Sequence, residues 1–145
     1  MIVAGLQKDL LSTSTYDILI GLNTLCKLIC PMMVTSFVEI IERLLAHNNA
    51  LVRKKAYCVY QQILKISPSS LTNYQIKMKD TLADDNPSVM GVGLNLFYDQ
   101  IKKNPNMYKD LGKQLVSQFQ QILDHKLHKD YDFQRLPAPW LQIKF

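Results

Sequence analysis

The chain has 145 residues, of which 48% are hydrophobic, and it carries a formal net charge of +5 at pH 7. This length corresponds to one domain or one piece of a larger protein, with enough apolar residues for a sizeable core. The most apolar stretch, residues 18–34, is interrupted by Asn23, Lys27 and Pro31, so it falls short of the roughly 18 continuous apolar residues of a membrane span. The mild positive charge permits attraction to an anionic membrane or an acidic partner. Because no nucleic-acid-reading motif accompanies it, we expect no nucleic-acid partner.

The cysteine usage and the N-terminus indicate a cytosolic protein. Cys26, Cys30 and Cys58 all lie in apolar helical patterns, so we expect them to be reduced and buried. Lys8 and Asp9 interrupt the first eleven residues, and no small-residue cleavage site follows a long apolar core. We therefore predict no signal peptide.

Apolar residues at helical spacing predict helices along almost the whole chain. Residues 1–11 have the pattern of the end of a helix, and residues 12–14 offer an N-cap for the next. The further helices that the pattern predicts are 15–30, 33–46, 50–66, 71–82, 87–103, 108–124 and a short one from Pro139.

The helix over residues 50–66 has the clearest pattern. Its apolar residues step by 4, 3, 4 and 3, which places them on one helical face: Val52, Ala56, Val59, Ile63 and Ile66. Asn48 or Asn49 can cap its start. Pro68 disfavours helical geometry at the residue before it and is expected to end the helix.

Turns and loops separate these helices. Pro87 fits the first position of the helix over 87–103. Residues 125–137 are polar and are predicted to form a long surface loop. Because the sequence has no sustained period-2 run and no hairpin dipeptide such as Asn-Gly, we predict no β-structure.

Three helix-ending prolines repeat at a fixed interval. Pro31, Pro68 and Pro105 are separated by 68 − 31 = 37 and 105 − 68 = 37 residues. Other pairs share this separation: Val52 with Val89, and Ala56 with Gly93. Helix pairs with about this period are typical of HEAT and armadillo repeats. We therefore predict an all-α fold, part of a right-handed HEAT/armadillo-type solenoid of antiparallel helix pairs, in which small residues such as Ala56 and Gly93 allow close helix packing.

No residue pattern indicates catalysis or a cofactor. The run Gly91-Val92-Gly93 lies inside a helix and lacks the lysine of a phosphate-binding loop, so packing glycines are expected. Cys26 and Cys30 stand four residues apart without further ligands nearby, and His125 and His128 lie in the polar segment. We interpret the cysteines as structural and the histidines as solvated. We predict a protein that is not an enzyme and has no cofactor, metal or small-molecule substrate.

The basic triplet Arg53, Lys54 and Lys55 is the candidate interaction site. It lies at the start of a helix, where positive charge opposes the helix dipole. One use is an inter-repeat salt bridge, to Asp84 or Asp85. The other is contact with an anionic membrane or an acidic partner. We favour the structural use and keep the contact as an alternative.

Several segments resemble the N-terminal trunk of large adaptins, the vesicle-coat adaptor subunits. The matching segments are residues 51–56 (LVRKKA), 84–90 (DDNPSVM), 104–105 (NP), 108–111 (YKDL) and 137–143 (PAPWLQI). The last resembles the segment that opens a helix in alpha and epsilon large chains. The segments together favour the epsilon chain of adaptor protein complex 4, with alpha and gamma adaptin next. The resemblance covers nearly the whole chain and is weakest over residues 1–34 and in the polar loop.

The resemblance implies a non-enzymatic scaffold subunit that sorts cargo from the trans-Golgi network. Its expected partners are a beta-type large chain, a medium chain, a small chain and an ADP-ribosylation-factor GTPase. The expected location is cytoplasmic, peripheral on trans-Golgi and coated-vesicle membranes. The alternative is a generic HEAT-repeat protein-binding scaffold outside vesicle traffic. Since the family continues with an apolar helix after Ile143, residues 1–145 are expected to be a partial trunk domain, truncated at both ends.

Overall fold

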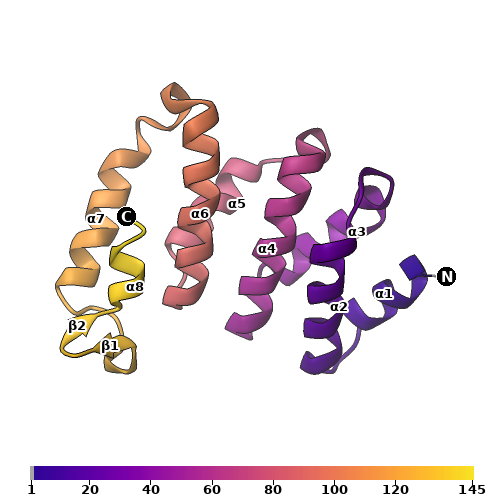
Figure 1. Cartoon of the computed structure of the whole chain (residues 1–145), viewed down its shortest axis with the longest axis horizontal. Coiled ribbons are helices and arrows are strands. Elements are labelled where there is room, and N and C mark those ends of the chain that lie inside the picture. The colour runs from indigo at the N-terminus through magenta and orange to yellow at the C-terminus, as the bar shows by residue number, and fades with distance from the viewer. Residues whose placement is uncertain (1) are drawn as a thin grey trace. The chain divides into compact units, whose positions relative to one another are not determined.

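The computed structural model describes residues 2–145, and within them it contains eight α-helices and one very small sheet (Figure 1). The predicted all-α, helical-repeat class is therefore confirmed. The chain divides into two compact units, and the boundary between them in the sequence lies between Tyr74 and Gln75. Each unit is described by itself. Met1, where we expected the first helix to begin, lies outside the described residues.

The N-terminal unit is built from four helices in two layers. They are α1 (Ile2–Leu10), α2 (Thr15–Leu28), α3 (Pro31–Leu44) and α4 (Ala50–Ile66). One layer contains α1 and α3, the other contains α2 and α4, and α1 packs on α2 as α3 packs on α4 (Figure 1). The largest fully buried side chains of this unit are Leu10, Leu22, Leu25, Phe37, Ile41, Tyr60 and Ile63. Two layers of amphipathic helices thus bury one shared apolar core.

The predicted apolar face of α4 is confirmed over four of its five positions. Val52, Ala56, Val59 and Ile63 are fully buried, whereas Ile66, in the last turn, is 38% exposed. The helix begins after Asn49, whose side-chain oxygen accepts a hydrogen bond from the backbone N–H of Leu51 at 2.8 Å. This bond satisfies one of the amide groups that a helix leaves unpaired at its start, as the sequence predicted.

The repeated prolines begin helical segments, which corrects the sequence prediction that they mainly end them. The second helix ends at Leu28, and Pro31 is the first residue of α3. Pro68 begins the 3₁₀ turn η1 (Pro68–Ser70), and Pro105 begins η2 (Pro105–Tyr108). The fixed φ of proline and its missing N–H suit the first turn of a helix, where that N–H has no partner.

The C-terminal unit is more irregular than predicted. Its helices are α5 (Tyr74–Leu82), α6 (Pro87–Lys103), α7 (Leu111–Leu123) and α8 (Pro139–Gln142), and its last 3₁₀ turn is η3 (Lys129–Tyr131). Helix α5 begins three residues later than expected, after Asn73, whose φ of 52° is outside the helical region. Pro87 is the first residue of α6, as predicted, and Asn86 caps that helix by accepting from Ser88 N at 2.9 Å.

A two-stranded hairpin interrupts the segment that the sequence predicts as loop only. Strands β1 (Asp132–Phe133) and β2 (Leu136–Pro137) pair antiparallel, with Phe133 opposite Leu136. The prediction of no β-structure was therefore wrong. The signal was weak because two-residue strands cannot show a period-2 pattern, and because the turn uses Gln134 and Arg135 at positive φ instead of asparagine and glycine.

Two further sequence predictions are tested by the fold. The three cysteines are thiols outside any disulfide, but each is half-buried, so the expectation of full burial was wrong. No α-helix within residues 2–145 combines the length and the apolar character that crossing a membrane requires.

Candidate functional site

The basic triplet lies in the first two turns of α4, and its three side chains are all half-buried. Arg53 Nη1 donates hydrogen bonds to the backbone oxygens of His47 at 3.0 Å and of Asn48 at 3.1 Å. These oxygens belong to the turn between α3 and α4. The guanidinium therefore fastens the turn that precedes its own helix, and the carbonyl dipoles there offset the unfavourable helix dipole. Sequence reasoning noticed the unfavourable dipole but did not identify these acceptors.

A second side-chain hydrogen bond stabilises the turn between α3 and α4. His47 Nδ1 accepts a hydrogen bond from Asn49 N at 3.0 Å, next to the Asn49 cap.

The positive charge of α4 is not balanced by acidic residues within the helix's own sequence. Residues 50–66 include Arg53, Lys54, Lys55 and Lys65 and no acidic residue. Within α4 itself, no carboxylate offsets these four cations.

A buried tyrosine hydroxyl belongs to the later part of α4. Tyr60 is fully buried, and its Oη has no hydrogen-bond partner among residues 2–145. Burial raises the pKa of Tyr60 far above its ordinary value, and the nearby Glu42, Tyr57 and Tyr74 raise it further. Such a group keeps its proton at physiological pH and is not poised for acid–base chemistry. The ring packs edge to face on Tyr57, with centroids 6.4 Å apart.

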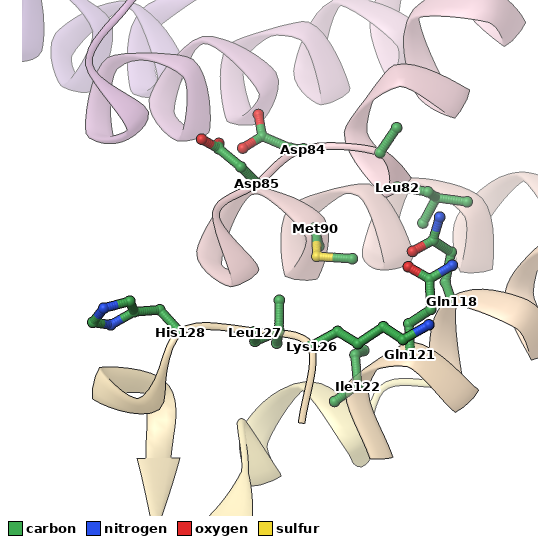
Figure 2. Close-up of a pocket in the computed structure, with 11 residues that line it drawn as sticks. Leu82, Asp84, Asp85, Met90, Gln118, Gln121, Ile122, Lys126, Leu127 and His128 are labelled. Atoms are coloured by element: carbon green, nitrogen blue, oxygen red, sulfur yellow. The ribbon is translucent and has the colours of Figure 1, made fainter. Parts of the chain in front are cut away.

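The C-terminal unit contains a pocket of about 350 Å³ between the α5–α6 turn and the end of α7 (Figure 2). Met90 and Leu127 face each other across it, and Gln118, Gln121 and Lys126 lie on the side of α7 (Figure 2). Amide groups and one ammonium group around apolar side chains can hold a polar chain segment by hydrogen bonds. They do not supply a nucleophile with a neighbouring base.

The carboxylates of Asp84 and Asp85 point away from Leu127 (Figure 2). Asp84 Oδ1 accepts a hydrogen bond from Asn86 N at 2.9 Å, so it fixes the turn that begins α6. His128, on the opposite wall, points outward. The titratable groups around this pocket therefore do not converge on one point inside it.

Both histidines of the polar segment lie beside carboxylates. His125 Nδ1 is 3.6 Å from Asp132 Oδ2, and His128 Nδ1 is 3.2 Å from Asp130 Oδ2. His128 Nδ1 also accepts a hydrogen bond from Asp130 N at 3.3 Å and thereby caps η3. Both side chains are exposed, as the sequence predicted. In residues 2–145 no group of three or more His, Cys, Asp or Glu side chains is arranged to hold a metal ion.

The hairpin is anchored to the rest of the C-terminal unit through its base. Asn86 Nδ2 donates to Tyr131 Oη at 3.2 Å, and the backbone N–H of Ala138 donates to Tyr131 O at 3.0 Å. Gln142 Nε2 donates to the oxygen of Pro137 at 2.6 Å, and both Pro137 and Ala138 are buried. The tip of the hairpin is exposed, although its base is fixed.

Comparison with known proteins identifies the family. The model of the adaptin N-terminal region matches residues 1–145. The chain is 35% identical over 144 residues to the AP-4 complex subunit epsilon of Arabidopsis thaliana and 30% identical over 144 residues to the AP-4 complex subunit epsilon-1 of Homo sapiens. It is also 28% identical over 107 residues to the AP-3 complex subunit delta-1 of Bos taurus.

The three alignments differ in how much they cover. They include 99%, 99% and 74% of this chain, but only 15%, 13% and 9% of the respective relatives. The match to the epsilon subunits extends across both compact units. The resemblance to epsilon-type adaptins is thereby confirmed, and the chain belongs to the adaptin N-terminal-region family.

Proposed function

We propose that these 145 residues are a segment of the trunk of an epsilon-type large chain in a vesicle-coat adaptor complex. The segment acts there as a non-enzymatic scaffold in intracellular protein transport and cargo sorting from the trans-Golgi network. The observation that carries the proposal is the match to AP-4 epsilon subunits over 99% of the chain at 30–35% identity. Generic HEAT-repeat scaffolds share the architecture, but that alternative does not explain this identity along the whole chain.

The proposed partners are a beta-type large chain, a medium chain, a small chain and an ADP-ribosylation-factor GTPase. The names of the relatives, which are all complex subunits, support the first three. The proposed location is cytoplasmic and peripheral, on trans-Golgi and coated-vesicle membranes. A scaffold role is supported by what the side chains do, because Arg53, Asn49 and Asn86 all fasten turns between helices.

We also propose that Lys54 and Lys55 contact an anionic membrane or an acidic partner. Two observations support this contact: both side chains are partly exposed, and no carboxylate lies along α4. Arg53 contributes by holding the turn in place through its bonds to His47 and Asn48. Two matched variants test this contact. Lys54→Gln/Lys55→Gln removes the two charges that are proposed to make it. The control, Lys102→Gln/Lys103→Gln, removes two charges at the end of α6.

Co-expression of the chain with the small and medium chains of adaptor protein complex 4 tests the main proposal. We expect the three chains to co-purify through affinity capture and gel filtration. The corresponding small and medium chains of complex 1 serve as the specificity control, and they should be captured less. Circular dichroism of the purified chain establishes that it is folded. A folded chain that captures neither set would contradict the adaptor assignment and favour a scaffold outside vesicle traffic.

A further inference from the structure

The hairpin of the C-terminal unit carries two exposed apolar side chains at its tip. Phe133 is 61% exposed and Leu136 is 55% exposed, and they are direct cross-strand partners. Cross-strand partners lie on the same face of a ribbon. The other pair, Asp132 with Pro137, is half-buried and buried respectively. The hairpin therefore turns one pair toward the protein and presents the apolar pair to the surroundings.

Three exposed basic residues occur in the same segment as this apolar pair. Lys126, Lys129 and Arg135 are all exposed, and Arg135 lies in the turn between the two strands. The two acidic side chains of the same segment, Asp130 and Asp132, each lie beside an imidazole, at 3.2 Å and 3.6 Å. With three basic and two acidic residues, residues 126–136 have a formal charge of 3 − 2 = +1, and Arg135 places one of the positive charges at the tip beside the apolar pair.

The tip is held in this conformation at a cost in backbone strain. Gln134 and Arg135 both have positive φ, at 49° and 68°, which side chains other than glycine and asparagine rarely adopt. The base is fixed by the bonds of Tyr131 to Asn86 and to Ala138. The apolar pair is therefore presented on a rigid support.

We propose that the hairpin tip, formed by Phe133, Leu136 and Arg135, inserts into the interface of an anionic lipid membrane. Two side chains on two-residue strands offer far less area than the roughly 800 Å² per partner of a stable protein interface. An apolar wedge with adjoining basic residues is enough for reversible attachment to an anionic bilayer. The proposal rests on the peripheral membrane association proposed above, and it names the lipid-contacting part of the C-terminal unit.

Vesicle sedimentation of the full 145-residue chain provides the first test. We expect binding to phosphatidylcholine vesicles that contain about one third phosphatidylserine, and weak binding to phosphatidylcholine alone. Replacement of both apolar side chains in Phe133→Ser/Leu136→Ser should weaken binding by roughly tenfold or more. The variant Arg135→Asn, which suits the positive φ, should weaken it by about fivefold. The control Ile76→Ser removes an apolar side chain of the same 61% exposure on α5 and should leave binding unchanged.

A fluorescent reporter tests whether the tip itself enters the bilayer. Trp140 is the single tryptophan of the chain, so Trp140→Phe/Phe133→Trp places the only indole at the tip. Its emission should shift to the blue on addition of the anionic vesicles and should be quenched by brominated lipid. A tryptophan at position 76 in the same background should show neither effect.

Each result decides the proposal. Binding that depends on Phe133 and Leu136, together with the spectral shift, supports it. Binding that the double variant retains when Lys54→Gln/Lys55→Gln is also present, or a reporter that vesicles do not affect, overturns it. A reporter that responds only to purified adaptor subunits also overturns it, because a protein then occupies the tip. Loss of vesicle binding with normal capture of the small and medium chains would reject this inference without touching the adaptor assignment.

Discussion

Gly93 of α6 lies so close to Thr81 of α5 that a Cβ at position 93 would overlap the threonine hydroxyl oxygen. That hydroxyl donates a hydrogen bond to Met78 O at 2.6 Å, and Thr81 is fully buried. The threonine therefore cannot move aside without breaking a buried hydrogen bond. This contact fixes the distance between α5 and α6 in the C-terminal unit.

The variant Gly93→Ala should destabilise the chain by about 1–3 kcal/mol, because the added methyl group forces the helices apart. The intrinsic helix preference of alanine opposes this loss by less than about 1 kcal/mol. Chemical denaturation followed by circular dichroism measures the difference. The matched control is Gly112→Ala on α7, where a Cβ would meet no atom of residues 2–145 within 4 Å apart from its chain neighbours and its own helix backbone, and it should be neutral or stabilising. Equal effects of the two substitutions would contradict the packing role of Gly93.

Arg53→Ala should destabilise the N-terminal unit by about 1–2 kcal/mol, because two backbone oxygens of the α3–α4 turn lose their charged donor. Lys54→Ala, one position along the same helix, should change stability by less than about 0.5 kcal/mol. Denaturation at low and high salt extends the measurement. The contribution of Arg53 should persist at high salt, since direct hydrogen bonds are screened less than separated charges. A loss that disappears in salt would indicate a purely electrostatic role.

Particular residues show what could be predicted from the sequence and what could not. Asn49, Pro87 and the apolar face of α4 act locally, so their effects follow from the neighbouring residues alone. The acceptors of Arg53 and the contact between Gly93 and Thr81 depend on how the chain turns back between helices. Helical periodicity fixes the face on which a residue lies, but it does not identify the atom that the residue meets.

At the candidate sites, too, features set by neighbouring residues could be predicted, whereas features set by the path of the chain could not. The basic triplet was evident from its charge, whereas the hairpin was not, because its turn contains neither asparagine nor glycine. The signal that remains is the pair of apolar residues, Phe133 and Leu136, on either side of Gln134 and Arg135 in an otherwise polar segment. Helix α5 begins later than the apolar pattern predicts because Asn73 has a left-handed backbone conformation, which asparagine adopts more readily than most residues but which apolar spacing does not reveal.

Tyr60→Phe should leave stability at neutral pH unchanged or raise it by up to about 1 kcal/mol, because the buried Oη has no hydrogen-bond partner to lose within residues 2–145. The effect at high pH is larger. An unfolded tyrosine ionises near pH 10, whereas burial raises the pKa of Tyr60 in the folded chain, so the folded state retains a proton that the unfolded state has released. Stability therefore falls as pH rises above about 10. Denaturation between pH 8 and pH 11 should show a smaller loss for Tyr60→Phe than for the parent chain. Tyr16→Phe, at an exposed position, should match the parent.

The double substitution Gln134→Asn/Arg135→Gly should stabilise the hairpin by about 1 kcal/mol, since asparagine and glycine accept the positive φ angles of 49° and 68° at little cost. Hydrogen exchange of the amide of Ala138, which donates to Tyr131 O at the hairpin base, should slow accordingly. The opposite substitution, Arg135→Val, places a β-branched residue at positive φ and should speed that exchange. Because Phe133 and Leu136 remain in both variants, the apolar pair is kept while the rigidity of its support changes. Equal exchange rates in the parent and both variants would show that the turn conformation does not limit hairpin opening.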